Sequence, residues 1–267
     1  MTPVAGLTLA FVLTLFAGLA TGVGGIIATL ARAGNHRFLS FSLGLSAGVM
    51  IYVSMMEMMP QANQRLVEQF GDKQGAWVSV AAFFGGIVLT GVIDRLVPEQ
   101  VNPHEADLTP HAMAARNQSL QRTGLVTAAA VALHNFPEGF ATFISALEDL
   151  QLGIPIAVAV GIHNIPEGIA VAVPIHQASG SRRKGILAAW LSGLAEPIGA
   201  MIGYLLLRPF LTEATLGITF GVVAGIMVFI SFDELLPTAE EYGEHHLTIY
   251  GLIAGMAVMA LSLLLLM

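Results

Sequence analysis

Two near-copies of one six-residue motif stand 29 residues apart in this chain. They are His134-Asn135-Phe136-Pro137-Glu138-Gly139 and His163-Asn164-Ile165-Pro166-Glu167-Gly168. Each motif offers an imidazole, an amide oxygen and a carboxylate, which are ligand types that divalent transition metals accept. Because residues four apart lie on one face of a helix, each histidine is expected beside the glutamate of its own motif. The spacing therefore predicts that each motif directs a nitrogen and several oxygens to one point.

Both motifs lie in the middle of apolar stretches long enough to cross a bilayer. An ionisable side chain at bilayer depth costs about 2.5 to 3.5 kcal/mol on insertion scales, and a bound divalent cation is the simplest compensation. The proline of each motif lacks an N–H and clashes with the carbonyl four residues earlier. We therefore expect a kink that leaves the carbonyls of Leu133 and Ile162 without donors. Broken helices at mid-membrane are where transporters place ion sites.

The composition indicates an all-α, polytopic membrane protein. The chain is 55% hydrophobic and 11% charged, with a mean hydropathy of +0.75, which lies outside the range of soluble domains. We expect one transmembrane domain over residues 1–267, with a cytoplasmic loop at about 98–121. The eight expected transmembrane helices are Val4 to Leu30, Phe38 to Met59, Ala76 to Leu96, Thr123 to Leu147, Gly153 to Ile175, Lys184 to Leu207, Leu216 to Leu236 and Leu247 to Leu266.

The basic residues predict the orientation, because short cytoplasmic loops retain Lys and Arg. One predicted side has Arg32, Arg37, Arg95, Arg116, Arg122, Arg182, Arg183 and Lys184. The other side has Arg65, Lys73 and Arg208. Both termini should therefore be extracytoplasmic. The fourth and fifth helices then run in opposite directions, so the two motifs form an inverted pair.

Two further features of the composition exclude other kinds of site and partner. The chain has no cysteine, so it has neither a disulfide framework nor a thiolate site of the type that Cu(I) prefers. The net charge of -7 is located mainly in loops and helix ends, so we expect no nucleic-acid partner. The expected partners are the lipid bilayer and divalent metal ions, without a prosthetic group.

Other polar residues inside the spans have two interpretations each. Glu196, followed by Pro197, repeats the carboxylate-beside-proline pattern in the sixth span. It is either a metal ligand on a third helix, which we favour, or a lone buried glutamate kept protonated by desolvation. Met50 is either a packing residue or a thioether ligand contributed by the second helix. Glu57, seven residues later on the same face, is either a pathway entrance or a solvated helix end.

Acidic and histidine residues on the predicted cytoplasmic side are also ambiguous. Asp233 and Glu234 end the seventh span and form either an exit station for the ion or a helix end in water. The histidines of the cytoplasmic loops are His104, His111, His245 and His246. They either chelate metal weakly, as a sensor would, or simply solvate the loops.

The chain resembles the ZIP family of divalent metal transporters, and within it the bacterial ZupT-type branch. The resemblance covers the eight spans, both outward termini, the paired His-Asn-x-Pro-Glu-Gly motif, an acidic residue in the sixth span and a histidine-containing loop. It implies a binuclear mid-membrane centre between the fourth, fifth and sixth helices. The implied ligands are His134, Asn135, Glu138, His163, Asn164, Glu167 and Glu196. Glu138 and Glu167 would bridge the two ions, and Met50 matches a position that can add a ligand to the first ion.

The resemblance also implies a multi-pass protein of the cell (inner) membrane. Members of the family are thought to transport by sliding one helix bundle against another, commonly as homodimers.

The residues and the resemblance together predict a carrier that moves divalent transition metals into the cytoplasm, not an enzyme. Ligands of imidazole nitrogen, amide oxygen and carboxylate suit zinc, iron(II), manganese, cobalt and cadmium, whereas magnesium and calcium prefer oxygen alone. One alternative is an intramembrane zinc-dependent metalloenzyme, although no His-Glu-x-x-His motif occurs. Another is a metal sensor without transport, although eight spans in 267 residues leave almost no soluble domain to transmit a signal.

Overall fold

The computed structural model describes residues 3–30, 36–96, 128, 131–132, 135–210, 212–241 and 245–266. Within these ranges the regular elements are helices joined by short turns. They are α1 (Pro3–Leu30), α2 (His36–Val53), the π-helix η1 (Ser54–Met58), α3 (Met59–Phe70), α4 (Asp72–Leu96), a helix over 135–148, α6 (Leu150–Ser179), α7 (Arg182–Gly193), α8 (Ala195–Leu207), the 3-10 helix η2 (Arg208–Phe210), α9 (Glu213–Ile230), the π-helix η3 (Ser231–Leu235), α10 (Leu236–Glu241) and α11 (His245–Leu266).

The prediction of an all-α, polytopic membrane protein is confirmed. Seven helical stretches in the described residues are long and apolar enough to cross a membrane. The helix over 135–148 occupies the second half of the remaining expected span, the fourth. All eight expected spans thus have a helical counterpart, and the protein is a multi-pass membrane protein.

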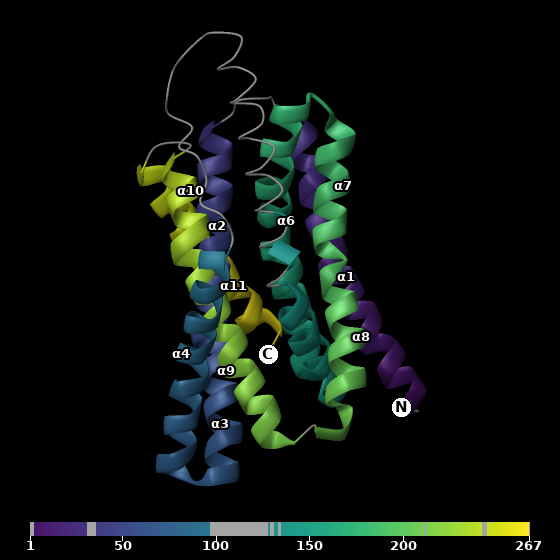
Figure 1. The fold of residues 1–267 in the computed structure, drawn as a ribbon, viewed down its shortest axis with the longest axis vertical. Helices are drawn as coiled ribbons and strands as arrows, with labels where there is room; N and C mark the ends of the chain where they lie inside the picture. Colours follow the sequence, from purple (N-terminus) through teal and green to yellow (C-terminus); the bar gives the residue numbers. More distant parts are fainter. Residues whose placement is uncertain are drawn as a thin grey trace.

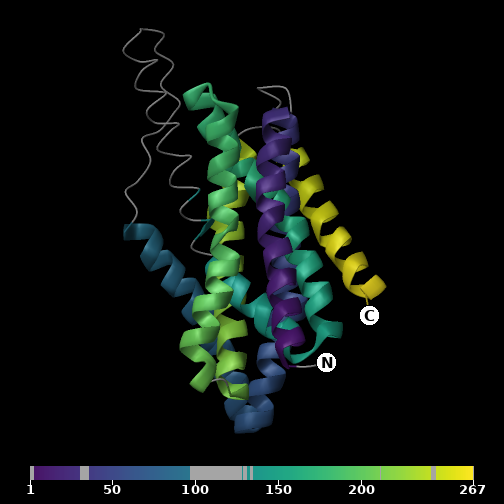
Figure 2. The same ribbon diagram turned by 90° about the vertical axis from the view of Figure 1, so that its right-hand side faces the viewer.

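The helices form two bundles (Figure 1). The first bundle contains α1, α6, α7, α8 and the 135–148 helix. The second contains α2, α3, α4, α9, α10 and α11. Within the first bundle α1 packs along α6, and the perpendicular view in Figure 2 shows α1 crossing in front of it. The two bundles contact each other where α2 packs against α6.

The second and seventh spans are longer than the sequence predicted. We expected them to end at Met59 and Leu236, but the helices continue to Phe70 and Glu241. In each span a five-residue π-helix precedes the proline, and the amide of the next residue, Met59 or Leu236, bonds to the carbonyl five residues earlier. The wider turn accommodates the following proline, which has no N–H and cannot donate a backbone hydrogen bond. The interpretation of Glu57, Asp233 and Glu234 as helix ends was therefore wrong.

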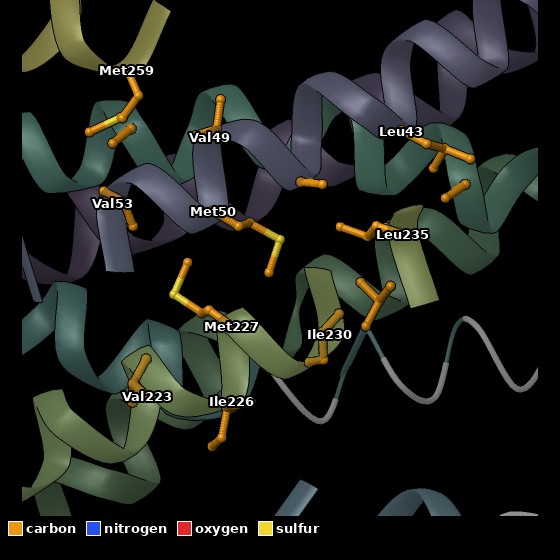
Figure 3. Close-up of a cluster of buried hydrophobic side chains, with 14 of the residues drawn as sticks. Leu43, Val49, Met50, Val53, Val223, Ile226, Met227, Ile230, Leu235 and Met259 are labelled. Carbon is orange, nitrogen blue, oxygen red and sulfur yellow. The ribbon is translucent and has the colours of Figure 1, made fainter. Parts of the chain in front are cut away.

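The two π-helices belong to an internal repeat that the paired histidine motifs do not predict. Residues 47–62 and 224–239 are identical at seven of sixteen aligned positions, and each copy has the pattern Ser-x-x-Glu-x-x-Pro. The serine hydroxyl of each copy donates to the carbonyl of the methionine four residues earlier, at 2.7 and 2.8 Å. These methionines, Met50 and Met227, are buried and point toward each other between α2 and α9 (Figure 3). Because α2 and α9 run in opposite directions (Figure 1), the repeat is inverted.

The turns between helices lie at two opposite ends of the molecule (Figure 1). The turn at Gly71, which has a φ of 83°, lies at the same end as η2. The starts of α2 and α7 lie at the other end. Lys73 and Lys184 are therefore at opposite ends, as the charge pattern requires. That the Lys184 end faces the cytoplasm stays a prediction.

An ion-pair cluster joins the two bundles near the Lys73 end. Arg65 of α3 contacts Glu148 at 2.6 Å and Glu213 at 2.7 Å. Its guanidinium also lies 5.4 Å from the centre of the Phe220 ring. Glu148 is the last residue of the 135–148 helix, whereas the other three residues belong to the second bundle. Arg65 is thus held by its own bundle and reaches across to the other.

Candidate metal centre

The described ligands of the two motifs, together with Glu196, all lie on helices of the first bundle. Their side chains are fully buried, with 0% exposure, wherever the structure describes them. The described ligands are Asn135 and Glu138 on the 135–148 helix, His163, Asn164 and Glu167 on α6, and Glu196 on α8. His134 lies outside the described residues.

The motif on α6 does not interrupt its helix, and the kink that we expect at its proline stays a prediction. The helix runs without interruption through Pro166 from Leu150 to Ser179. Its ends are fixed by Asp149, which accepts the amide of Gln151, and by the left-handed Gly180. A single proline removes only one backbone hydrogen bond, so the rest of a long, capped helix remains intact.

A helix break occurs in the sixth span, beside Glu196. α7 ends at Gly193 and α8 begins at Ala195, so that Leu194 forms a turn between them. Pro197 cannot donate to the carbonyl of Gly193, which contributes to the interruption, although the same loss at Pro166 does not interrupt α6. Glu196 consequently lies in the first turn of a helix, where the helix dipole stabilises a carboxylate.

The first close pair of ligands joins the two motifs. The Oε1 atom of Glu138 lies 3.0 Å from the Nε2 atom of His163. This Oε1 is within hydrogen-bonding distance but is not aligned for a hydrogen bond. Two donor atoms bound to one tetrahedral zinc at about 2.0 to 2.1 Å lie about 3.3 Å apart. The separation of Glu138 and His163 is close to that value, so the two side chains can bind the same ion.

The second close pair joins α6 to α8 and involves α1. The Nδ2 atom of Asn164 donates to the carbonyl of Ala17 at 2.9 Å and to the Oε1 atom of Glu196. Both partners are acceptors, so they fix which end of the amide carries the nitrogen. The Oδ1 atom of Asn164 has no hydrogen-bond partner among the described residues. Asn164 therefore orients Glu196 and keeps an oxygen available as a ligand.

The buried charge of this region is negative. Glu138, Glu167 and Glu196 are all fully buried. None of the lysine and arginine side chains that the structure describes is buried. Buried carboxylates require a compensating charge, and a divalent cation is suited to that role.

The site is not a closed cage. Within the described part of the chain, no three His, Asp or Glu side chains gather closely enough to form one. Four of the six described ligands form two close pairs, Glu138 with His163 and Asn164 with Glu196.

The glycine that ends each motif lets another helix approach. A Cβ atom on Gly139 would lie 2.2 Å from the carbonyl oxygen of Glu196. A Cβ atom on Gly168 would lie 1.8 Å from the carbonyl oxygen of Thr21 on α1. These positions exclude any larger side chain, so the sequence Glu-Gly places each glutamate at a close contact between helices.

The second helix touches the centre through a residue that we did not predict. The hydroxyl of Ser46 donates to the carbonyl of His163 at 3.4 Å. Met50 lies one turn further along α2, in the apolar core beside Met227 (Figure 3). The role of Met50 as a thioether ligand stays a prediction.

The predicted pathway residues belong to the second bundle and are not part of the centre. Glu57 lies in η1, is half-buried and accepts a hydrogen bond from Gln61 at 2.7 Å. Asp233 and Glu234 lie in η3, with Asp233 exposed and Glu234 half-buried. Among the predicted loop histidines, His104 and His111 lie outside the described residues, and His245 pairs with Glu240 at 2.8 Å.

The contribution of α1 was not predicted from the sequence either. The group involved is the backbone carbonyl of Ala17, which no side-chain pattern identifies. The available signal was the run of small residues from Ala17 to Gly25, which indicates a helix that other helices approach closely.

Comparison with known proteins identifies the family. A family model described as ZIP Zinc transporter matches residues 94–263. The chain belongs to the ZIP zinc transporter family. Zinc transporter ZupT of Corynebacterium glutamicum is 59% identical to it over 96% of this chain and 98% of that protein. Zinc transporter ZupT of Clostridium perfringens is 57% identical over 96% of this chain and 95% of that protein.

A third relative, zinc transporter ZupT of Streptococcus mutans, is 57% identical over 96% of this chain and 97% of that protein. The resemblance inferred from the paired motif is therefore confirmed, and the two motifs lie within the matched residues. Proteins of this family are divalent metal transporters and not enzymes, so the chain is a transporter and the metalloenzyme alternative is set aside.

Proposed function

We propose that this ZIP protein carries zinc and other divalent transition metals into the cytoplasm through the paired motifs. The observation that carries the proposal is the set of three fully buried glutamates, Glu138, Glu167 and Glu196, with no buried lysine or arginine among the described residues. A transported dication supplies the charge that these carboxylates need, and the surrounding imidazoles and asparagines supply further ligands.

The charge balance is compatible with one or two ions. Three ionised glutamates carry a charge of -3, so one divalent ion leaves -1 and two leave +1. Both states are close to neutral, which keeps the cost of burial low. A binuclear centre bridged by Glu138 and Glu167 fits this balance. Each of the two ligand pairs, Glu138 with His163 and Asn164 with Glu196, would contribute to the binding of one ion.

The ligand set predicts the metals that are accepted. Imidazole nitrogen combined with carboxylate and amide oxygen suits zinc, iron(II), manganese, cobalt and cadmium. Magnesium and calcium, which prefer oxygen ligands alone, should be poor substrates. Discrimination within the first group should be weak, because no cysteine is available to select a softer ion.

The distribution of the ligands between the bundles supports transport by relative movement. Every motif ligand that the structure describes lies in the first bundle, while α2 of the second bundle contacts the site through Ser46. If the first bundle moved relative to the second, these ligands would move together with the bound ion. The protein is proposed to work in the cell (inner) membrane with both termini extracytoplasmic, and as a homodimer by resemblance to its family.

Uptake of radiolabelled zinc by proteoliposomes tests the proposal. Liposomes containing the purified protein should accumulate zinc above protein-free liposomes, and excess iron(II), manganese, cobalt or cadmium should compete. Excess magnesium or calcium should not compete. A sensor without transport activity would bind zinc without accumulating it inside the vesicles, and that result would contradict the proposal.

A further inference from the structure

One buried hydroxyl in the 135–148 helix lacks a hydrogen bond that other serine and threonine hydroxyls of this protein make. Seven serine and threonine hydroxyls donate to the carbonyl four residues earlier in their own helix. They are Thr14, Ser54, Thr90, Ser145, Ser179, Thr219 and Ser231. Thr142 is fully buried, yet its Oγ1 has no hydrogen-bond partner among the described residues.

The usual acceptor is within reach of Thr142. The carbonyl four residues earlier belongs to Glu138, in the same relation that the seven other hydroxyls use. A threonine in a helix has two accessible side-chain rotamers, and only one of them makes this bond. Burying a hydroxyl without a hydrogen bond costs free energy that nothing else recovers. The orientation of Thr142 is therefore not explained by the stability of its helix.

Thr142 extends the row of predicted metal ligands. Asn135, Glu138 and Thr142 are spaced three and four residues apart, so they lie on one face of the helix. All three are fully buried, and each has side-chain oxygen atoms without a hydrogen-bond partner among the described residues. Thr142 lies one turn, about 6 Å, beyond Glu138. This turn leads toward Glu148, at the end of the helix that we predict to face outward.

We propose that the Thr142 hydroxyl is an additional oxygen ligand of the transported cation, one helical turn outside Glu138. It binds the divalent ion directly or through one of the ion's bound waters. A neutral hydroxyl holds a dication less strongly than a carboxylate does, so it suits a position through which the ion passes to or from the glutamates. This inference rests on the proposed function.

A second buried hydroxyl, that of Thr21, has a different explanation. Its Oγ1 also has no partner among the described residues. Its usual acceptor is the carbonyl of Ala17, which already accepts the amide of Asn164. Competition for that carbonyl accounts for Thr21.

The test is to replace Thr142 with valine, which keeps the shape and removes the hydroxyl. Thr14→Val is the matched control, because Thr14 is equally buried in the same bundle but donates to Ala10 at 3.0 Å. Thr142→Ser keeps the hydroxyl. Thermal unfolding without metal, calorimetric zinc affinity and zinc uptake are measured for the purified parent and all three variants.

We expect Thr142→Val to unfold at the same temperature as the parent or higher, because an unbonded hydroxyl is removed. Its zinc affinity should fall by about 10-fold, the loss expected for one modest ligand. Thr14→Val should show the reverse, with a lower unfolding temperature and an unchanged zinc affinity. Thr142→Ser should bind zinc nearly as well as the parent.

Two results would overturn the inference. One is zinc affinity in Thr142→Val equal to that of the parent. The other is a fall in unfolding temperature as large as that of Thr14→Val together with loss of affinity in Thr142→Ser, which would mean that Thr142 is only structural. If the parent itself neither binds nor accumulates zinc, the proposed function fails as well, so the two failures are distinguishable.

Discussion

Replacing Gly139 with alanine should disturb the metal centre more than it disturbs the fold. The new Cβ atom would lie 2.2 Å from the carbonyl oxygen of Glu196 and 2.5 Å from its Cα atom. Both are backbone atoms, so no flexible side chain can move aside. The 135–148 helix and α8 must separate, and they carry Glu138 and Glu196 respectively.

The size of this separation follows from the contact distances. Ordinary van der Waals contact begins at 3.4 Å, so the two helices must move apart by about 1.2 Å. Overpacking of this kind costs about 1 to 3 kcal/mol, and alanine recovers up to about 1 kcal/mol through its higher helix propensity. Metal sites tolerate ligand displacements of only about 0.2 Å. We therefore expect a loss of unfolding free energy of about 0 to 3 kcal/mol, with zinc affinity reduced by about 10- to 100-fold.

The assay combines thermal unfolding of the purified protein with calorimetric zinc titration. Gly85→Ala is the matched control, because Gly85 lies in α4 and a Cβ atom there would meet nothing within 4 Å. The control should be as stable as the parent or more stable, with unchanged zinc affinity. Parental zinc affinity in Gly139→Ala would refute the idea that this glycine sets the distance between the two glutamates.

Three further predictions concern the ligands, the ion-pair cluster and the topology. Glu138→Ala and Glu167→Ala should each reduce zinc uptake more than Asn164→Ala does at matched expression, because each removes a buried charge; equal uptake by Glu167→Ala and the parent would remove the transport-site assignment. Arg65→Ala should lower the unfolding free energy by only about 1 kcal/mol, since its partners are partly exposed, and a loss several times larger in thermal unfolding would contradict this. An impermeant thiol reagent on whole cells should label Lys73→Cys and spare Lys184→Cys, and the opposite pattern would reverse the proposed direction of uptake.

Most of the fold could be predicted because membrane spans are read from length and apolar composition. The ends of the second and seventh spans could not, because Pro60 and Pro237 look like helix breakers in sequence. In the structure a π-helix lies before each proline and lets the helix continue although the proline cannot donate a hydrogen bond. The two Ser-x-x-Glu-x-x-Pro segments share a sequence pattern, which indicates that they share one backbone structure.

Helical spacing indicated which side chains of each motif share a helix face, and the described ones are fully buried on helices of the first bundle. The 3.0 Å contact between Glu138 and His163 joins two different helices, so the spacing within one motif could not predict it. The carbonyl of Ala17 and the hydroxyl of Ser46 were missed, because contacts between α1, α2 and α6 depend on packing that one sequence does not reveal. The kink expected at Pro166 stays a prediction, but the proline does not end α6, which is a long helix capped at both ends.

The position of the bound metal is the most direct test of the proposed transport site. Anomalous diffraction at the zinc absorption edge, from crystals of the protein grown with zinc, locates the ion without reference to activity. The predicted result is a strong zinc peak enclosed by Glu138, His163, Glu167 and Glu196. Zinc peaks confined to exposed residues such as His245 and Glu240, with none in the buried centre, would contradict the proposal.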